Sequence, residues 1–170
     1  AVGVREGGRQ EWTVLVEKQL LQQDKELAKK ALDRLQRQLD ELMRVFPKPS
    51  QERFSKLKLF LMFGPRSDGG GRDNGLEYFQ KDAPQHYANL DPRMASSILI
   101  YSAENYVWLP ERRALMALAH EFGHACQLEQ WPENEPRIYD AWEHAMQHGL
   151  YRNVKDENGE VLEQRYAAVN

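Results

Sequence analysis

Asp24 to Phe46, DKELAKKALDRLQRQLDELMRVF, is the stretch that decides the fold of this chain of 170 residues. Its apolar side chains recur every three or four residues, as on one face of a helix: Leu27, Ala28, Ala31, Leu35, Leu39, Leu42, Val45 and Phe46. Pro47 and Pro49 are expected to end this helix. The stripe could cover the domain's own sheet or, over about three heptads, a helix of a partner chain. We expect it to pack on the domain's own sheet.

Strands for that sheet are predicted on both sides of the helix. Trp12 to Val16, Leu57 to Phe63 and Ser97 to Tyr101 are rich in β-branched, aromatic and other apolar residues. Tyr106 to Leu109 is expected to continue the extended chain, whereas Gly64 to Gly75 is dense in Gly, Asp and Asn and is expected to be a loop. These elements predict an α+β fold in which a small mixed sheet carries the long helix.

The bulk composition excludes several classes of protein. A net charge of −3 without a basic stripe argues against nucleic acid as a partner. The apolar runs are too short to span a membrane, and no signal peptide is visible at Ala1. The single cysteine, Cys126, excludes an intrachain disulfide framework and is expected to be a small buried residue, although a metal ligand or an inhibitory thiol is the alternative. We expect one domain over residues 1–170, and a monomer.

The motif His120-Glu121-Phe122-Gly123-His124 carries the functional prediction. Pro110 and Glu111 suit the start of a helix, and Leu115, Leu118, Ala119, Phe122 and Cys126 form its apolar stripe. On a helix the two histidines lie one turn apart and within about 40° of each other, so one metal ion can bind both imidazoles. Glu121 projects to the flank of this pair, where its carboxylate can act as a general base on a metal-activated water. We also expect Gly123 to allow close packing against another element.

A catalytic zinc ion needs a third protein ligand and one open position. Glu143 is the best candidate within the chain, because it follows His124 by 19 residues on a helix predicted from Glu135 or Pro136 through Gln147. Four other side chains are weaker candidates: Glu129, Asp140, His144 and His148. Residues 156–159, Asp-Glu-Asn-Gly, predict a turn or hairpin tip further along the chain.

Two blocks of this sequence resemble a family of mostly secreted bacterial and fungal zinc metallopeptidase-like proteins. The first is Leu118 to Ala125, and the second runs from Ile138 to Trp142, through Gly149 to Tyr151, to Tyr166-Ala167-Ala168-Val169-Asn170. The segments Trp12 to Val14 and Ser102 to Tyr106 also look like that family. Its catalytic region is similar to that of the anthrax lethal factor group, which implies a zincin-like catalytic domain with an active-site helix.

The resemblance implies a gluzincin-like endopeptidase that uses Zn²⁺, acts on peptide or protein substrates, and is secreted or periplasmic. It gives Tyr166 the role of donating a hydrogen bond to the developing oxyanion. It also places the third zinc ligand on a glutamate just beyond Asn170, in which case the chain as given stops short of that ligand and Glu143 is not one. If the chain is complete, Glu143 is the leading candidate.

Two other functions stay open at this stage. The first is a zinc-binding but catalytically inactive interaction module that holds an extended peptide against the strand at Leu57 to Phe63. The second is a helical interaction protein built on Asp24 to Phe46, in which the motif has no function. We rank the metallopeptidase first, because the motif lies within a helical apolar pattern and follows an extended segment.

Overall fold

The computed structural model describes residues 2–3, 12–131, 135–150, 152, 154, 155, 159 and 161. The chain divides into two compact units, Ala1–Gln130 and Trp131–Asn170. Within the first unit the strands are β1 (Val2–Gly3), β2 (Thr13–Val16), β3 (Lys58–Leu61), β4 (Leu76–Phe79) and β5 (Ser97–Ile100). Its helices are α1 (Lys18–Gln23), α2 (Lys25–Val45), α3 (Lys48–Phe54), α4 (Ala83–His86), α5 (Ala103–Trp108) and α6 (Glu111–Gln130). Two 3₁₀ turns, Gly64–Arg66 and Pro92–Met94, complete it.

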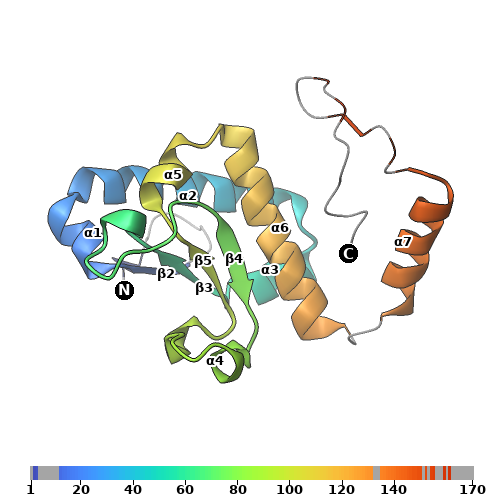
Figure 1. Cartoon of the computed structure of the whole chain (residues 1–170), viewed down its shortest axis with the longest axis horizontal. Helices are drawn as coiled ribbons and strands as arrows, with labels where there is room; N and C mark the ends of the chain where they lie inside the picture. The colour runs from blue at the N-terminus through green and yellow to red at the C-terminus, as the bar shows by residue number, and fades with distance from the viewer. Residues whose placement is uncertain are drawn as a thin grey trace. The chain divides into compact units, whose positions relative to one another are not determined.

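The strands form one mixed sheet in the order β1-β2-β3-β5-β4 (Figure 1). The neighbours β2 and β3, and β3 and β5, are parallel, whereas β1 and β4 pair antiparallel with their neighbours. The predicted mixed sheet within an α+β fold is therefore confirmed. Because β3 lies between β2 and β5, it has no free edge. Both edges of that strand are already paired, so a peptide cannot be added to the sheet at β3.

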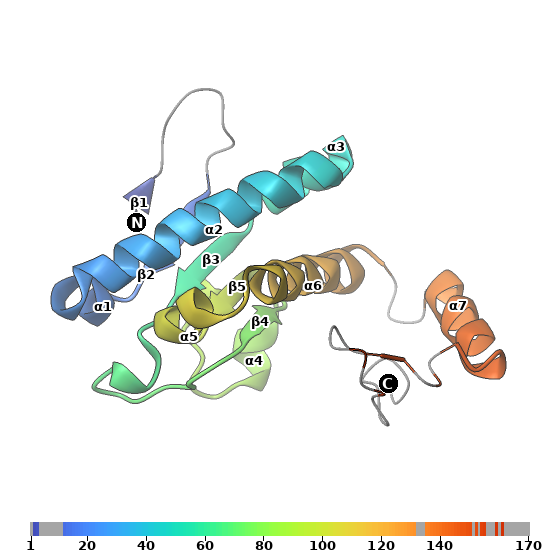
Figure 2. The same ribbon diagram turned by 90° about the horizontal axis from the view of Figure 1, so that it is seen from above.

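The long helix α2 packs on one face of this sheet, as its stripe predicts. Leu27, Ala31, Leu35 and Leu39 on α2 join the same core as Leu59 and Ile98 of the sheet. Asp24 caps the helix by accepting a hydrogen bond from the Leu27 backbone amide at 3.0 Å. Helices α5 and α6 contribute to the same core, and a smaller cluster that includes Ala83 of α4 covers the other face (Figure 2).

The region after α2 contains one more helix than the sequence predicts. Pro47 and Pro49 do follow the end of α2 at Val45, but α3 begins at once at Lys48, with Pro49 in its first turn. This position suits proline, because the first amides of a helix have no partner within the helix. The prolines therefore separate two helices where the sequence analysis expected a single helix end.

The prediction of extended chain at Tyr106–Leu109 is wrong, because Ala103–Trp108 forms α5. Ser102 caps its start by accepting a hydrogen bond from the Asn105 amide at 3.2 Å. At its other end, the Arg34 guanidinium of α2 donates to the carbonyls of Tyr106 and Val107, at 2.6 and 2.7 Å. A side chain from 72 residues away thus stabilises a helix that its own sequence signals only weakly.

In the second unit, Pro136–Gln147 forms α7, which confirms the predicted helix. Lys155 and Val161 form an isolated antiparallel bridge on either side of the predicted turn, whose residues 156–158 lie outside the described part of the chain. Among the described helices of both units, none combines the length and the apolar character needed to cross a bilayer.

Candidate functional site

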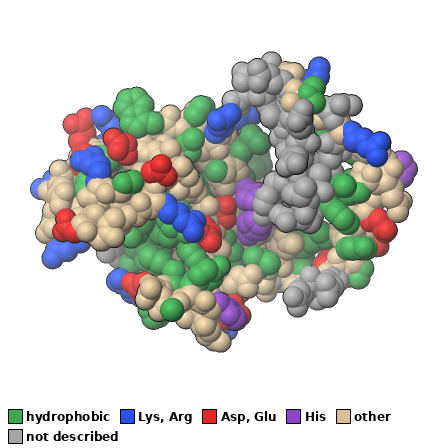
Figure 3. Space-filling model, viewed as in Figure 1, with side chains coloured by type: hydrophobic (Ala, Val, Ile, Leu, Met, Phe, Trp, Pro, Cys, Tyr) green, Lys and Arg blue, Asp and Glu red, His purple; other side chains and the backbone are tan. Residues whose placement is uncertain are grey.

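The motif helix α6 is anchored to the core through the middle residue of the motif. Phe122 is fully buried, and its ring lies 4.7 Å from that of Phe54 and 5.8 Å from that of Trp12, measured between centroids. Each motif histidine is two residues from Phe122, so the turn of about 100° per residue directs both away from this aromatic cluster. Figure 3 shows histidine side chains at the surface over α6.

His120 and His124 converge on each other at this surface. Their Nε2 atoms are 2.9 Å apart, and the two rings are nearly perpendicular, with centroids 4.4 Å apart. Zinc–nitrogen bonds of about 2.0–2.1 Å in a tetrahedral arrangement place two ligating nitrogens about 3.4 Å apart. The separation of 2.9 Å, a hydrogen bond between the two rings, is within about half an ångström of that value.

The surroundings of His124 favour its neutral form. Burial lowers the pKa of its imidazole, and the neighbouring His120 lowers it further. A neutral imidazole has the free lone pair that a metal ion requires, so less proton competition opposes metal binding at this residue.

Glu121 lies on the flank of α6 and faces strand β4. Its side chain is buried, with 7% of the residue exposed, and its Oε2 atom accepts a hydrogen bond from the Tyr78 backbone amide at 2.7 Å. Burial raises the pKa of this carboxyl to about 7; the Tyr78 amide opposes the shift, and the charge of Glu77 adds to it. A carboxyl with a pKa near 7 can both accept and release a proton at neutral pH, as a general base must.

Tyr78 makes a second contact with α6, one that the sequence analysis did not foresee. Its phenol donates to Glu129 Oε1 at 2.7 Å, and burial, followed by this bond, raises the pKa of the phenol above its usual range. Edge strand β4, which lies beside the motif helix (Figures 1 and 2), is therefore joined to it at two points, through Glu121 and through Glu129. The two aromatic residues of the run Leu76–Phe79, directly after Gly75, were the available signal for this strand.

A buried polar cluster fixes the start of α6. Arg34 bonds the Leu109 carbonyl at 2.7 Å and lies 3.1 Å from the Glu111 carboxylate, at the first residue of the helix. Gln38, which is fully buried, donates to Glu111 Oε1 and accepts from the Tyr106 phenol at 2.7 Å. Arg34 and Gln38 occupy positions within the apolar stripe of α2, and polar residues at such positions are the sequence signal for a buried network.

The candidates for a third ligand are distributed over both units. Glu129 bonds Tyr78, and it follows His124 by five residues, which turns it about 140° away around the helix. Glu143 and the weaker candidates Asp140, His144 and His148 belong to the second unit. Within the described residues, no group of three metal-ligating side chains comes together. Tyr166 and Asn170 lie outside the described residues.

Two smaller expectations about the motif helix have different outcomes. A Cβ atom at Gly123 would meet nothing within 4 Å, so the expectation that this glycine permits close packing is wrong; it is exposed on the outer side of α6. Cys126 is partly buried and packs against the main core, as expected of a small residue on the inner stripe.

No protein-family model, curated protein or solved structure matches this chain.

Proposed function

We propose that this protein is a zinc-dependent peptide hydrolase, in which His120 and His124 bind the metal and Glu121 is the general base. One observation carries the proposal: the motif residues of α6 point in three directions around the helix, and each direction has a different environment. Phe122 is buried in the core, Glu121 is held against β4, and the histidine Nε2 atoms meet at the surface 2.9 Å apart. A helix whose two histidines met only by chance would give no reason for a buried, hydrogen-bonded carboxylate on the flank between them.

The residues divide the chemistry as follows. When bound, zinc lowers the pKa of a coordinated water molecule and polarises the scissile carbonyl. His120 and His124 hold the ion through Nε2 as neutral imidazoles, and the lowered pKa of His124 favours that form. Glu121 accepts the proton of the attacking water and passes it to the leaving amine. Its hydrogen bond with the Tyr78 amide engages Oε2, so on this proposal Oε1 would carry the proton.

Three parts of this proposal rest on the resemblance described above. A gluzincin-like site would take its third ligand from a glutamate beyond Asn170, and Tyr166 would donate a hydrogen bond to the oxyanion. Glu143 is the alternative third ligand within the chain. A secreted or periplasmic location, with peptides or proteins as substrates, belongs to the same proposal.

A second candidate is a zinc-binding module that holds peptides without cleaving them. The hydrogen bond between Glu121 and the Tyr78 amide favours it, because a carboxylate retained at β4 is not available to a water molecule. The two candidates agree on the metal ligands and differ only in what Glu121 does.

Metal analysis combined with a quenched-peptide library separates these candidates. The hydrolase predicts one zinc ion per chain and measurable turnover, which Glu121→Gln abolishes while the zinc content is unchanged. Glu41→Gln, at an exposed position on α2, is the matched control and should keep full activity. Stoichiometric zinc without turnover in the unmodified protein would favour the binding module, and full activity in Glu121→Gln would exclude Glu121 as the base.

A further inference from the structure

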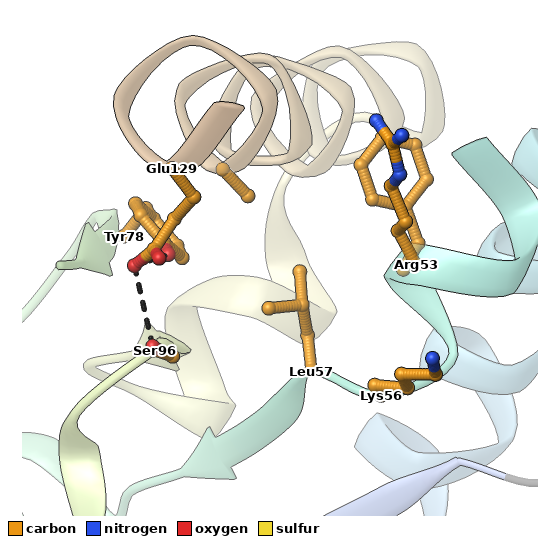
Figure 4. A pocket seen from close by; sticks show the side chains of 8 residues that line it. Arg53, Lys56, Leu57, Tyr78, Ser96 and Glu129 are labelled. Carbon is orange, nitrogen blue, oxygen red and sulfur yellow. Dashed lines mark hydrogen bonds between the residues drawn. The ribbon is translucent and has the colours of Figure 1, made fainter. Parts of the chain in front are cut away.

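Two pockets adjoin strand β4, and their surfaces differ in character. The pocket between α3, β4 and α6, about 240 Å³ in volume, exposes almost only apolar surface, and Glu129 at its wall already accepts hydrogen bonds from Tyr78 and Ser96 (Figure 4). The second pocket, which we call the α4 pocket, has a volume of about 190 Å³ and exposes both polar and apolar surface. The α4 pocket can therefore recognise a ligand by its charge as well as by its shape.

Helix α4 and its two flanking residues contribute one polar and one apolar pair to this pocket, whose other lining residues are 78–80. Asp82 and His86 are four residues apart, and so are Ala83 and Tyr87, so the members of each pair lie one turn apart on the same side of the helix. Consecutive residues differ by about 100° around a helix, which places the two pairs next to each other. One side of the pocket is therefore polar, and the neighbouring side is apolar and aromatic.

Asp82 stands at the start of α4 but does not cap it. An aspartate at this position commonly accepts a hydrogen bond from a backbone amide of the first turn, and the Asp82 side chain makes no such bond. Its Oδ2 atom lies 3.2 Å from His86 Nε2, and because a carboxylate only accepts, the imidazole is the donor. Oδ1 makes no hydrogen bond to any described residue. His86 thus orients the carboxylate through one oxygen, and a ligand can bond the other without the loss of this contact.

The charge and the aromatic side of the α4 pocket both favour a cation. Asp82 is the one carboxylate among its described lining residues, and none of them is a lysine or an arginine. The Tyr87 and Phe79 rings are nearly perpendicular, with centroids 5.8 Å apart, and Tyr87 is 54% exposed whereas Phe79 is buried. An accessible aromatic ring attracts a cation through its quadrupole, and a carboxylate attracts it through its charge. Together they suit a flat organic cation.

We propose that the α4 pocket binds a guanidinium group, which donates to Asp82 Oδ1 and lies against the Tyr87 ring. A guanidinium group suits these two partners better than an ammonium group, because it is planar and can stack on a ring while it donates within its own plane. The lining includes neither the proposed metal ligands nor the proposed base, so the site is independent of the proposed function. Because the Asp82 side chain is 51% exposed, its ion pair contributes modestly, and we expect affinities in the millimolar range.

The test compares capped arginine (Nα-acetyl-L-arginine amide) with capped citrulline, in which a neutral urea group of nearly the same shape replaces the guanidinium. In two-dimensional NMR spectra of the full chain, capped arginine should shift the amide signals of Gln80 and Ala83 and bind about three- to tenfold more tightly than capped citrulline. Equal affinities for the two probes, or the absence of binding, would overturn the proposal. Free L-arginine distinguishes two sources of the group: tighter binding than that of capped arginine indicates the free amino acid, and equal or weaker binding indicates an arginine side chain within a peptide.

Two variants test the two sides of the site. Asp82→Asn should weaken the binding of capped arginine about two- to fivefold and change that of capped citrulline less, because asparagine keeps the shape and removes the charge. Tyr87→Leu should also reduce the preference for capped arginine, since it keeps apolar surface and removes the ring. Asp73→Asn, at an exposed position that does not line the pocket, is the matched control and should bind as the unmodified protein does. If Asp82→Asn kept the full preference for capped arginine, the ligand would bind elsewhere and the assignment would be wrong.

Discussion

Glu121→Gln should stabilise the metal-free protein at alkaline pH, because it removes a carboxylate that the fold buries at a cost. Burial raises the pKa of this carboxyl from its ordinary value of 4.5 to about 7. At a pH between these two pKa values, Glu121 has lost its proton in the unfolded chain but retains it in the folded chain. The folded state binds more protons over this range, so stability falls as the pH rises from about 4.5 to about 7, and the loss is complete above it.

The size of the effect follows from the shift. One pKa unit corresponds to about 1.4 kcal/mol, so the ionised carboxylate costs the folded protein about 3 kcal/mol above pH 7. Most of this cost appears between pH 5 and pH 8, where it amounts to about 2 to 3 kcal/mol. A glutamine is neutral throughout, and its amide oxygen can still accept the hydrogen bond from the Tyr78 amide. Relative to the unmodified protein, the free energy of unfolding of the variant should therefore rise by about 2 to 3 kcal/mol from pH 5 to pH 8.

Urea denaturation at pH 5 and pH 8, with a chelator present, measures this gain. For each protein we take the change in the free energy of unfolding between the two pH values, and we then compare this change between the variant and the unmodified protein. Effects of pH on all other groups then cancel, and Glu41→Gln gives the baseline for the loss of an exposed carboxylate. If the free energies of unfolding of Glu121→Gln and of the unmodified protein changed in parallel with pH, Glu121 would not be buried against β4. The orientation of the motif helix described here would then be wrong.

Four other substitutions test three separate parts of the structure. His120→Ala or His124→Ala should each abolish stoichiometric zinc after dialysis, measured by atomic absorption, because one imidazole cannot replace the pair; retention of zinc by both variants would contradict the assignment. Tyr78→Phe should cost about 1 kcal/mol in urea denaturation, since it removes the phenol that bonds Glu129, and zinc content should not change because neither of these side chains is a proposed metal ligand. Arg34→Met should cost about 3 to 5 kcal/mol, since it leaves three carbonyls without their donor; a loss below 1 kcal/mol would show that water replaces the guanidinium.

The long elements of this fold could be predicted from the sequence because each has a periodic pattern of its own. Helix α2 has 21 residues between Asp24 and Phe46, and its stripe is buried from Leu27 to Leu42, whereas Val45, expected in the stripe, is 72% exposed. The apolar residues Leu118 and Phe122 are fully buried, as the pattern of the motif helix predicts. In these elements burial depends on local spacing, which is present in the sequence.

The short elements could not be predicted in the same way, because distant residues stabilise them. Helix α5 has six residues, too few for a reliable period, and Arg34 of α2 satisfies its last carbonyls. Strand β4 has four residues and is joined to the sheet by β5 and to α6 by Glu121. The contact between Glu121 and Tyr78 joins residues 43 positions apart, so no local pattern indicates it.

The same contact explains why the sequence motif alone describes the candidate site incompletely. The spacing of His120 and His124 predicts that they meet, but it does not predict whether Glu121 lies in solvent or in the protein. In solvent this carboxyl would be ionised at neutral pH and a weak base, because its pKa would be near 4.5. Strand β4 removes the carboxyl from solvent and raises its pKa to about 7, so the proton affinity that a general base requires is supplied by the sheet. A variant that moved β4 away from α6 would therefore weaken the base while both metal ligands remained in place.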